Sequence, residues 1–388
     1  MKKFGTGKTP RTPQLPSGVQ RRPAEVGSLD GLLEELGVRL PAGEVEYTFV
    51  STWAGKHVVQ VDVDGEPFAF IRYLLGPANM FPDRWRHFRL GELVHEARVG
   101  PRVLGMTPES SALGGRAAIV EAALRPITRE ELTARSGEAI ALLARLHSSA
   151  AIHEALSADE TEADLLGLSP LARLFSETRE RWFDAVVQRW LELGLSEIGD
   201  LTAVVGDLMN RLQEQPPPSE RMGLVVPCHN DPNHGNFMVN RQGALRMIDF
   251  EGLALNNPVA DLGVFLDWYV APEDHVRLLE EYPLAEPKAI LERMRIWVPL
   301  RYLGIAAHWA ARMTRAQDQE ALAYGAASLG EWLNSAAHLV YEGDPPADIS
   351  EPLQRVLERL ENLTIEDLTS REARVEQGDR DEDDKKLA

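Results

Sequence analysis

The densest group of polar side chains lies at 228–236, where the sequence reads Cys-His-Asn-Asp-Pro-Asn-His-Gly-Asn. Asp231 is followed five residues later by Asn236, and thirteen residues further on by Asp249. A loop, a short hairpin and a second loop can bring these three side chains together at the ends of neighbouring strands. One carboxylate can then orient a hydroxyl group, while the amide and the other carboxylate offer the hard oxygen ligands that Mg²⁺ prefers. This spacing predicts a catalytic group suited to phosphoryl transfer.

The residues around this group form a longer pattern. His229-x-Asp231-x-x-x-x-Asn236, followed by Ile-Asp-Phe-Glu at 248–251, resembles the aminoglycoside phosphotransferase and choline kinase family. The segment 257–263 resembles the family's Asn-Pro-x-x-Asp-Leu-(Ala/Gly) stretch, and 142–147 resembles its Leu-Leu-x-x-Leu-His helix end. The resemblance covers about residues 45–340. The combined motif is specific, whereas an Asp and an Asn at this spacing alone would be weak evidence.

The resemblance implies an α+β, protein-kinase-like bilobal fold, with a small antiparallel-sheet N-terminal lobe and a mainly helical C-terminal lobe. It also implies ATP as the phosphate donor, with GTP not excluded, and Mg²⁺ as the metal. By the resemblance Asp231 is the catalytic base, Asn236 and Asp249 are magnesium ligands, and His229 is a structural residue that braces the loop. Asp261 is expected to be structural as well, as a cap or brace for the catalytic loop.

The N-terminal lobe contributes the expected nucleotide-binding residues. Arg72 stands on the strand 68–73 at the position expected to neutralise phosphate, and a guanidinium can clamp phosphate oxygens bidentately. An exposed strand arginine in an ion pair is an equally open reading of Arg72. Glu92 is the predicted carboxylate partner of Arg72, with Glu96 as the other acid on the same helix. The nucleotide-covering loop starts at Ser51, and the linker between the lobes contains Val120 and Glu121.

The charge distribution bears on the acceptor. The net charge is −19, from 60 acidic and 41 basic residues, and the stretch 25–370 alone holds −23. Such a field disfavours nucleic acid and attracts cations. We expect a small-molecule hydroxyl acceptor, with an amine-bearing molecule such as choline, ethanolamine or an aminoglycoside favoured. Its pocket is assigned to Glu251, Asp267 and Trp268, although most aromatic residues of the C-terminal helices should be core.

Two other functions stay open. A non-catalytic, nucleotide-binding pseudokinase scaffold would keep the fold without turnover, and the presence of all three motif residues argues against it. A zinc-dependent hydrolase could use His229, Asp231 and His234, because imidazole and carboxylate suit zinc. Cys228 ends an apolar strand, which indicates a buried and inert thiol.

The elements that must position these residues follow from apolar periodicity. A helix from residue 28 precedes an antiparallel meander at 47–50, 57–63 and 67–73, then a helix at 83–97 and strands at 102–105 and 116–122. Helical spacing recurs at 129–149, 177–195 and 197–212 before three short strands at 224–227, 236–240 and 245–249. Further helices are expected at 258–270, 272–281, 286–314, 316–341 and 351–363. The catalytic group therefore lies on a β island within helices.

The length of 388 residues favours two domains. We expect a disordered basic arm at 1–27, a nucleotide-binding lobe at 28–124, a helical lobe with the catalytic loop and acceptor pocket at 125–365, and a disordered charged tail at 366–388. One cysteine, no apolar leader and no apolar run of about 20 residues favour the cytoplasm and exclude a membrane span. The oligomeric state is left open.

Overall fold

The computed structural model describes residues 26–53, 56–80, 82–157, 170–193, 198–215 and 224–368. The chain forms two compact units. The first combines the chain up to Asp159 with Val226–Leu284, and the second combines Glu160–Val225 with Ala285–Ala388. The predicted lobes at 28–124 and 125–365 are a different division, which stays a prediction. Most of the arm at 1–27 and of the tail at 366–388, both expected to be disordered, lies outside the described residues, while 26–27 and 366–368 are helical.

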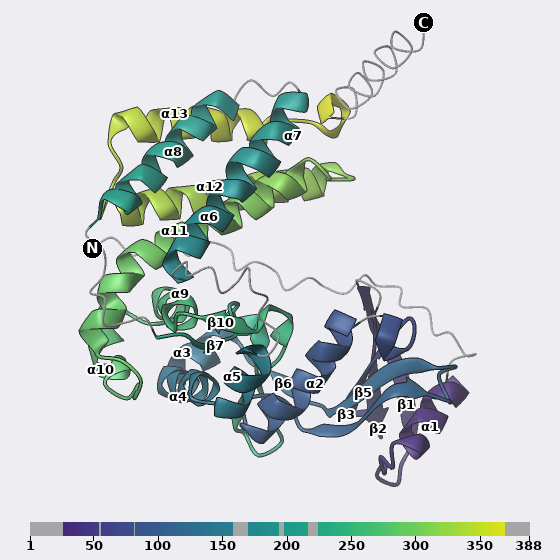
Figure 1. Ribbon diagram of the computed structural model, residues 1–388. Coiled ribbons are helices and arrows are strands. Elements are labelled where there is room, and N and C mark those ends of the chain that lie inside the picture. Colours follow the sequence, from purple (N-terminus) through teal and green to yellow (C-terminus); the bar gives the residue numbers. More distant parts are fainter. Residues whose placement is uncertain are drawn as a thin grey trace, which may run out of the picture. The chain divides into compact units, whose positions relative to one another are not determined.

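The first unit begins with helix α1 (Val26–Glu35) and a five-stranded antiparallel sheet in the order β1-β2-β3-β5-β4 (Figure 1). The strands are β1 (Val45–Trp53), β2 (Lys56–Val63), β3 (Glu66–Leu74), β4 (Val103–Ser110) and β5 (Arg116–Ala122). Alternating apolar residues give this sheet two covered faces. The predicted meander is confirmed, because β1, β2 and β3 are hydrogen-bonded in sequence order.

Each face of the sheet has its own apolar cluster. On one face Leu29 and Leu32 of α1 pack with Val61, Ile71 and Val120. On the other, Phe88 of α2 (Pro82–Glu96) packs with side chains of β3 and β5. The alternation of β3 thus sends Ile71 toward α1 and its neighbour Arg72 toward α2.

The rest of the first unit carries the candidate site on short strands. A three-stranded sheet in the order β6-β8-β9 joins β6 (Arg125–Pro126), β8 (Phe237–Val239) and β9 (Leu245–Met247), and β7 (Val226–Cys228) pairs with β10 (Ala254–Asn256). The helices are α3 (Arg129–Ala134), α4 (Ser136–His147), α5 (Ala150–Ser157), α9 (Val259–Tyr269) and α10 (His275–Leu279). Short 3₁₀ turns lie at Ala78–Met80, His234–Asn236, Phe250–Gly252 and Pro272–Asp274.

Two features differ from the expected elements. The helix predicted over 129–149 is divided at Arg135, which has non-helical dihedrals (φ −113°, ψ 25°), and a capping box at Thr128 and Glu131 starts its first part. The island at 224–249 has an additional partner, because Ala254 pairs with Cys228 and anchors β7. The three-residue strand β10 was not predicted.

The second unit is helical in its described part. It contains α6 (Pro170–Arg179), α7 (Val187–Glu192), α8 (Ile198–Glu214), α11 (Pro287–Met313), α12 (Gln319–Val340) and α13 (Ala347–Glu361). A π-helical segment, Glu180–Val186, joins α6 to α7 within the helix predicted at 177–195. The indoles of Trp182 and Trp190 are buried and donate to the carbonyls of Leu303 and Ala310, at 2.8 and 3.3 Å. These aromatic side chains are core residues.

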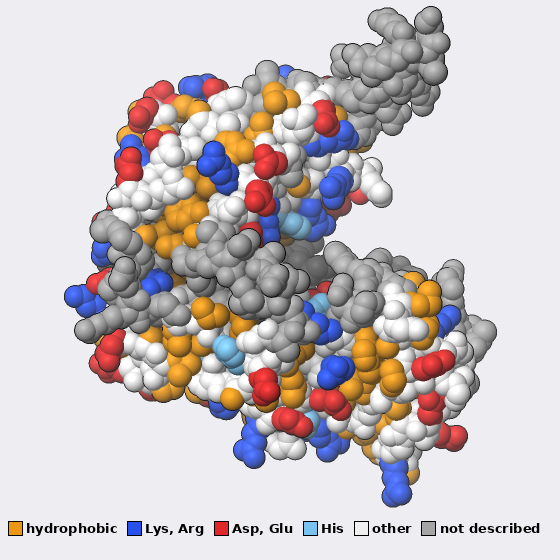
Figure 2. Space-filling view, viewed as in Figure 1, with side chains coloured by type: hydrophobic (Ala, Val, Ile, Leu, Met, Phe, Trp, Pro, Cys, Tyr) orange, Lys and Arg blue, Asp and Glu red, His pale blue; other side chains and the backbone are white. Residues whose placement is uncertain are grey.

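The surface carries no obvious segregation of charge on the face in Figure 2, where acidic and basic side chains alternate over the described residues. None of the described helices combines the length and apolar character needed to cross a bilayer.

Candidate active site

The β8–β9 hairpin places two of the predicted catalytic residues at one end. Phe237 pairs with Met247, and one step further the amide of Ile248 donates to the carbonyl of Asn236 at 3.0 Å. Asp249 follows Ile248 directly, so the hairpin register sets Asn236 and Asp249 beside each other. This is the convergence that the spacing in the sequence predicted.

Asn236 also holds Asp231. Its side-chain Nδ2 donates to the backbone carbonyl of Asp231 at 2.9 Å and to carboxylate Oδ2 at 3.0 Å. Asn233 Nδ2 donates to the same Oδ2 at 2.8 Å, while Asn233 Oδ1 accepts from the amide of Gly235 and caps the 3₁₀ turn. Asn236 is buried and Asp231 is exposed. The two hydrogen bonds to Oδ2 therefore orient the Asp231 carboxylate. Within the described residues, Oδ1 accepts no hydrogen bond.

Asp249 presents an exposed carboxylate from a constrained backbone. Its dihedrals (φ 64°, ψ 56°) lie in the left-handed region, which is costly for a residue with a Cβ. Across the described part of the chain its carboxylate makes no hydrogen bond, and neither does Oδ1 of Asn236. Two oxygen donors at one end of a hairpin match the ligand preference of Mg²⁺.

His229 connects the loop of Asp231 to that of Asp249. Its Nε2 donates to the carbonyl of Ile248 at 2.8 Å, so Nε2 carries a proton. Its ring lies 5.0 Å from that of Phe250, centroid to centroid. The buried Nδ1 has no hydrogen-bond partner among the described residues. The side chain fastens the two loops together at the residue before Asp249.

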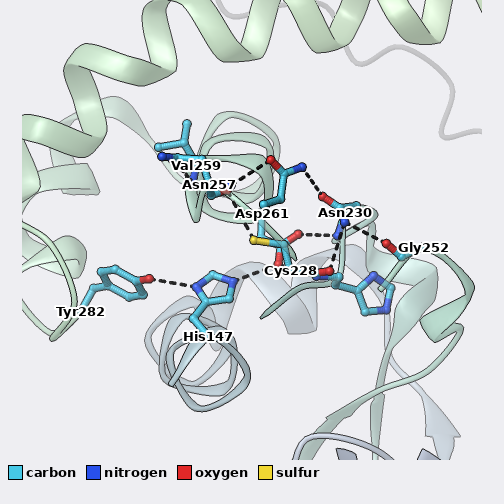
Figure 3. Close-up of polar contacts among 10 residues, drawn as sticks. His147, Cys228, Asn230, Gly252, Asn257, Val259, Asp261 and Tyr282 are labelled. Atoms are coloured by element: carbon cyan, nitrogen blue, oxygen red, sulfur yellow. Dashed lines mark hydrogen bonds and ion pairs between the residues drawn. The ribbon is translucent and has the colours of Figure 1, made fainter. Parts of the chain in front are cut away.

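Asp261 on α9 fixes the backbone of the catalytic loop (Figure 3). Its fully buried carboxylate accepts from the amides of His229 and Asn230, at 2.8 and 2.7 Å, and from Nε2 of His147 at 2.9 Å. The hydroxyl of Tyr282 lies 2.9 Å from the other imidazole nitrogen. Burial opposes ionisation of Asp261, but the hydrogen bond and charge of His147 and the contacts of His229 outweigh it, so the pKa is lowered.

Asn230 adds a second fixed point in the loop. It has a left-handed backbone (φ 65°), which asparagine tolerates better than most residues. Its Nδ2 donates to the carbonyls of Cys228 and Gly252, at 3.1 and 2.8 Å, and its Oδ1 accepts from Asn256 Nδ2 at 2.8 Å (Figure 3). The bond from Asn256 joins the loop to β10. The short strand β10 therefore helps to hold the loop in place.

Tyr269 holds the opposite side of the loop. Its hydroxyl accepts from the amide of His234 at 2.7 Å, and the guanidinium of Arg129 lies 5.3 Å from its ring centroid. Arg129 also donates to the carbonyl of Trp268 at 2.7 Å. Burial is the main reason that the pKa of His234 is lowered, followed by the charge of Arg129.

A zinc centre at His229, Asp231 and His234 gains no support from this geometry. Among the described residues, ligand atoms of three His, Cys, Asp or Glu side chains approach within 4.8 Å of one another only at His147, Cys228 and Asp261. That group is buried and its members are hydrogen-bonded to protein atoms, since Cys228 Sγ donates to the carbonyl of Asn257 at 3.4 Å. Burial and the charge of Asp261 raise the pKa of the thiol well above its usual value.

On the five-stranded sheet Arg72 pairs with Glu121. Arg72 Nη2 donates to Glu121 Oε1 at 2.7 Å, with side-chain exposures of 21% and 9%. The guanidinium carbon lies 5.5 Å from the ring centroid of Phe88. The expectation that Glu92 pairs with Arg72 is wrong, because Glu92 is exposed on α2 while the neighbouring Gly91 faces Glu121. A Cβ on Gly91 would lie 3.8 Å from Glu121 Oε1. The backbone of α2 therefore comes close to the Glu121 carboxylate at Gly91.

The remaining predicted residues are placed as follows. Val120 is buried in the cluster beneath α1, and Glu251 is exposed in the 3₁₀ turn after Asp249. The loop expected to start at Ser51 starts later, because Ser51 lies within β1 and pairs with Val58; its side chain lies outside the described residues. Asp267 is exposed and Trp268 half-buried at the end of α9, where the Trp268 ring lies 6.1 Å from that of Tyr269. A role for these three side chains in an acceptor pocket stays a prediction.

Comparison with known proteins identifies the family. The model of the phosphotransferase enzyme family matches residues 87–297, which is more than half of the chain. The chain belongs to this family. The match includes most of α2, the loop of Asp231, the hairpin and α9, and thus every residue of the hydrogen-bonded group around Asp231.

Two solved structures with a TM-score of 0.50 agree on the fold. The ternary complex of APH(2″)-IIa with streptomycin and ATP is similar with a TM-score of 0.50 at 13% identity, covering 83% of this chain and 99% of that one. The AMP-bound spectinomycin phosphotransferase APH(9)-Ia gives a TM-score of 0.50 at 15% identity, with 80% and 98% covered. An ethanolamine kinase from Plasmodium vivax gives 0.49 at 12% identity, with 75% and 83% covered. The protein-kinase-like fold class predicted from the motifs is confirmed.

Proposed function

We propose that this phosphotransferase moves the γ-phosphoryl group of ATP to a hydroxyl group of a small, amine-bearing molecule. The observation that carries the proposal is the double contact of Asn236 with Asp231, at 2.9 and 3.0 Å. It fixes a carboxylate and at the same time turns an amide oxygen away from it. A loop that served only as a turn would need neither an oriented carboxylate nor an amide oxygen left without a partner.

Asp231 acts on the acceptor. Oδ2 is held by Asn233 and Asn236, so Oδ1 is left to accept a hydrogen bond from the acceptor hydroxyl. The carboxylate aligns that oxygen with the phosphorus and takes its proton as the new bond forms. Positioning accounts for much of the rate in this chemistry, and the hydrogen bonds to Oδ2 restrict the carboxylate to one orientation.

Asn236 Oδ1 and the Asp249 carboxylate are the groups that would hold Mg²⁺. Both are hard oxygen donors, and the hairpin register places their residues side by side. The metal, when bound, neutralises charge on the nucleotide phosphates. The brace from His229 to the carbonyl of Ile248 keeps Asp249 in its left-handed conformation, so the carboxylate direction is set before the nucleotide binds.

Arg72 is proposed to contact the nucleotide phosphates. Its Nη2 is engaged by Glu121, while Nη1 has no partner among the described residues and stays available as a donor. Glu121 thus orients the guanidinium from β5, and Phe88 limits its movement from α2. The oriented fork is suited to bind two oxygens of one phosphate group.

An amine-bearing acceptor is favoured by charge. The chain holds 60 acidic against 41 basic residues, which concentrates cations near its surface. The structure with streptomycin bound belongs to a protein of the same fold, and choline or ethanolamine offers the same combination of amine and hydroxyl groups. The cytoplasm is the proposed compartment, since ATP is the proposed donor.

The test is acceptor-dependent formation of ADP or GDP. Purified full-length protein is incubated with Mg²⁺ and ATP or GTP, and with choline, ethanolamine, aminoglycosides, sugars or nucleosides in turn. We expect turnover with an amine-bearing alcohol, and a loss of about 10³-fold or more in Asp231→Ala and Asp249→Ala. Removal of Mg²⁺ by EDTA should abolish turnover reversibly.

The matched control is Glu273→Gln, which removes an exposed carboxylate of the same unit away from the catalytic loop. It should keep full activity. Nucleotide binding is measured in parallel by titration calorimetry. Binding without turnover for every acceptor class would favour a pseudokinase scaffold, and turnover that persists in Asp231→Ala would refute the assigned base.

A further inference from the structure

Three arginines outside the candidate active site are brought together by the fold of the first unit. The amide of Met247 on β9 donates to the carbonyl of Val99, just past the end of α2, at 2.8 Å. Helix α4 packs against β9. Arg98, Arg145 and Arg246 stand on these three segments, so residues distant in the sequence form one basic cluster.

The arginines of this basic cluster interact electrostatically. Burial lowers the pKa of Arg145, and the charge of Arg98 lowers it further. Burial also lowers the pKa of Arg246, followed by the charges of Arg145 and Arg98. The cluster extends to His95, whose pKa is lowered by burial and then by the charges of Arg102 and Arg246. Arg98 and Arg145 are exposed and Arg246 is half-buried, so the like charges lie together at the surface.

No carboxylate forms an ion pair with these three arginines in the described part of the chain. Arg98, Arg145 and Arg246 form no ion pair there, and the one hydrogen bond from a guanidinium of the three runs from Arg246 Nη1 to its neighbour's carbonyl at 2.7 Å. Glu96 acts on His95 by its charge and is itself exposed. In a protein with 19 net negative charges, an unbalanced group of arginines is unexpected.

The backbone at Arg98 has a left-handed conformation. Arg98 follows α2 with a φ of 56°. The amides of Val99 and Gly100 both donate hydrogen bonds to the carbonyl of Val94. Glycine is the favoured residue at such a helix end. Here the position is occupied by an arginine whose guanidinium adds like charge to Arg145 and Arg246.

We propose that the basic cluster of Arg98, Arg145 and Arg246 binds a multiply charged, phosphate-bearing anion. Guanidinium groups recognise phosphate oxygens bidentately, and an anion would supply the charge that the described residues lack. Among the described residues none of the three arginines hydrogen-bonds to the loop of Asp231 or to Arg72, and the proposal places the anion apart from the nucleotide. The inference does not depend on the proposed phosphotransfer.

The experiment uses pyrophosphate as the probe and the melting temperature of the full-length protein as the readout. Sodium chloride at equal ionic strength separates screening from binding. We expect pyrophosphate to raise the melting temperature of the wild type, because a ligand that binds the folded state stabilises it. Arg145→Gln, Arg246→Gln and Arg98→Gly should lose most of that increase. Arg98→Gly suits the left-handed backbone, so it keeps the test independent of folding defects.

Two control variants define the outcomes. Arg277→Gln removes an exposed arginine of the same unit that is paired with Asp274, and it should keep the full increase. Arg72→Gln should keep it as well if the anion binds at the cluster. The proposal is overturned if pyrophosphate does not stabilise the wild type beyond sodium chloride, if the cluster variants respond like the wild type, or if the increase disappears only in Arg72→Gln.

Discussion

The imidazole of His147 and the carboxylate of Asp261 lie 2.9 Å apart, and neither side chain is exposed to solvent. The same carboxylate accepts the amides of His229 and Asn230, so one buried pair on α4 and α9 fixes the backbone immediately before Asp231. An isolated buried carboxylate is costly, whereas one with three donors is compensated. The position of the Asp231 loop therefore depends on the buried side chains of His147 and Asp261.

Replacing His147 by alanine should loosen this loop. Breaking one partner of a buried pair costs about 3–5 kcal/mol, because the remaining charge loses its compensation. We expect a lower free energy of unfolding by urea and faster hydrogen exchange at the amides of His229 and Asn230. His153→Ala is the control, since the His153 side chain contacts Ser157 of the same helix, α5, and hydrogen-bonds to no other described residue. Equal exchange rates in both variants would contradict the role of the buried pair.

Arg72 and Glu121 should be energetically coupled. The two side chains are mostly buried and joined at 2.7 Å, so a double-mutant cycle with Arg72→Ala and Glu121→Ala should give about 1–3 kcal/mol of coupling in urea unfolding. Arg277 and Asp274 form the matched exposed pair, at 3.0 Å, and their cycle should give less than about 1 kcal/mol. A coupling for Arg72 and Glu121 no larger than that of the exposed pair would show that the contact does not orient the guanidinium.

The sequence predicts how the candidate catalytic residues come together better than it predicts the residues that support them. Asp231, Asn236 and Asp249 are close in sequence, and a local hairpin is enough to bring them together. The partner of Arg72 depends instead on the pairing of β3 with β5, in which Phe70 lies opposite Glu121 and sets it diagonally across from Arg72. The sequence of neither strand alone indicates which residues pair across the two strands. Glu92 lies on the predicted helix, but on its exposed face, away from this pairing.

The same distinction applies to the loop supports. The motifs that end at His147 and begin at Asn257 are present in the sequence, but Tyr282 binds to the network from outside both of them. Strand β10 has three residues, too few for an alternating pattern, although it anchors Asn230 through Asn256. By contrast, the longer strands of the meander and the helices had enough residues for their apolar periodicity to predict them.

Cys228 should make the protein less stable in alkali. Its pKa is raised in the folded state by burial and by the charge of Asp261, whereas an unfolded thiol ionises near pH 8.5. Above that pH the unfolded state loses a proton that the folded state keeps, so stability falls by about 1.4 kcal/mol per pH unit until the folded pKa is reached. Below about pH 8.5 this contribution is fully present.

Urea unfolding from pH 7 to 10 tests this, with Cys228→Ala as the comparison, because the variant lacks the titrating group and should lose that slope. Cys228 is the only cysteine of the chain, so a thiol reagent reports on it alone. The reagent should react with the native protein at least about 100-fold more slowly than with the unfolded protein. Rapid reaction in the native state, or equal slopes in the two proteins, would contradict a buried neutral thiol.

Asp249 combines a functional carboxylate with an unfavourable backbone, and two substitutions separate these properties. At a φ of 64° glycine is more stable than alanine by roughly 1–2 kcal/mol, because only alanine carries a Cβ. Asp249→Gly should therefore unfold at higher urea than Asp249→Ala, while both lose phosphotransfer. Asp64 supplies the control, since it has a φ of 53° in the turn between β2 and β3. Asp64→Gly and Asp64→Ala should differ in stability in the same direction and retain activity. If Asp249→Gly were active, the carboxylate would have no part in the reaction. Residue 249 would then serve only the left-handed turn of the loop.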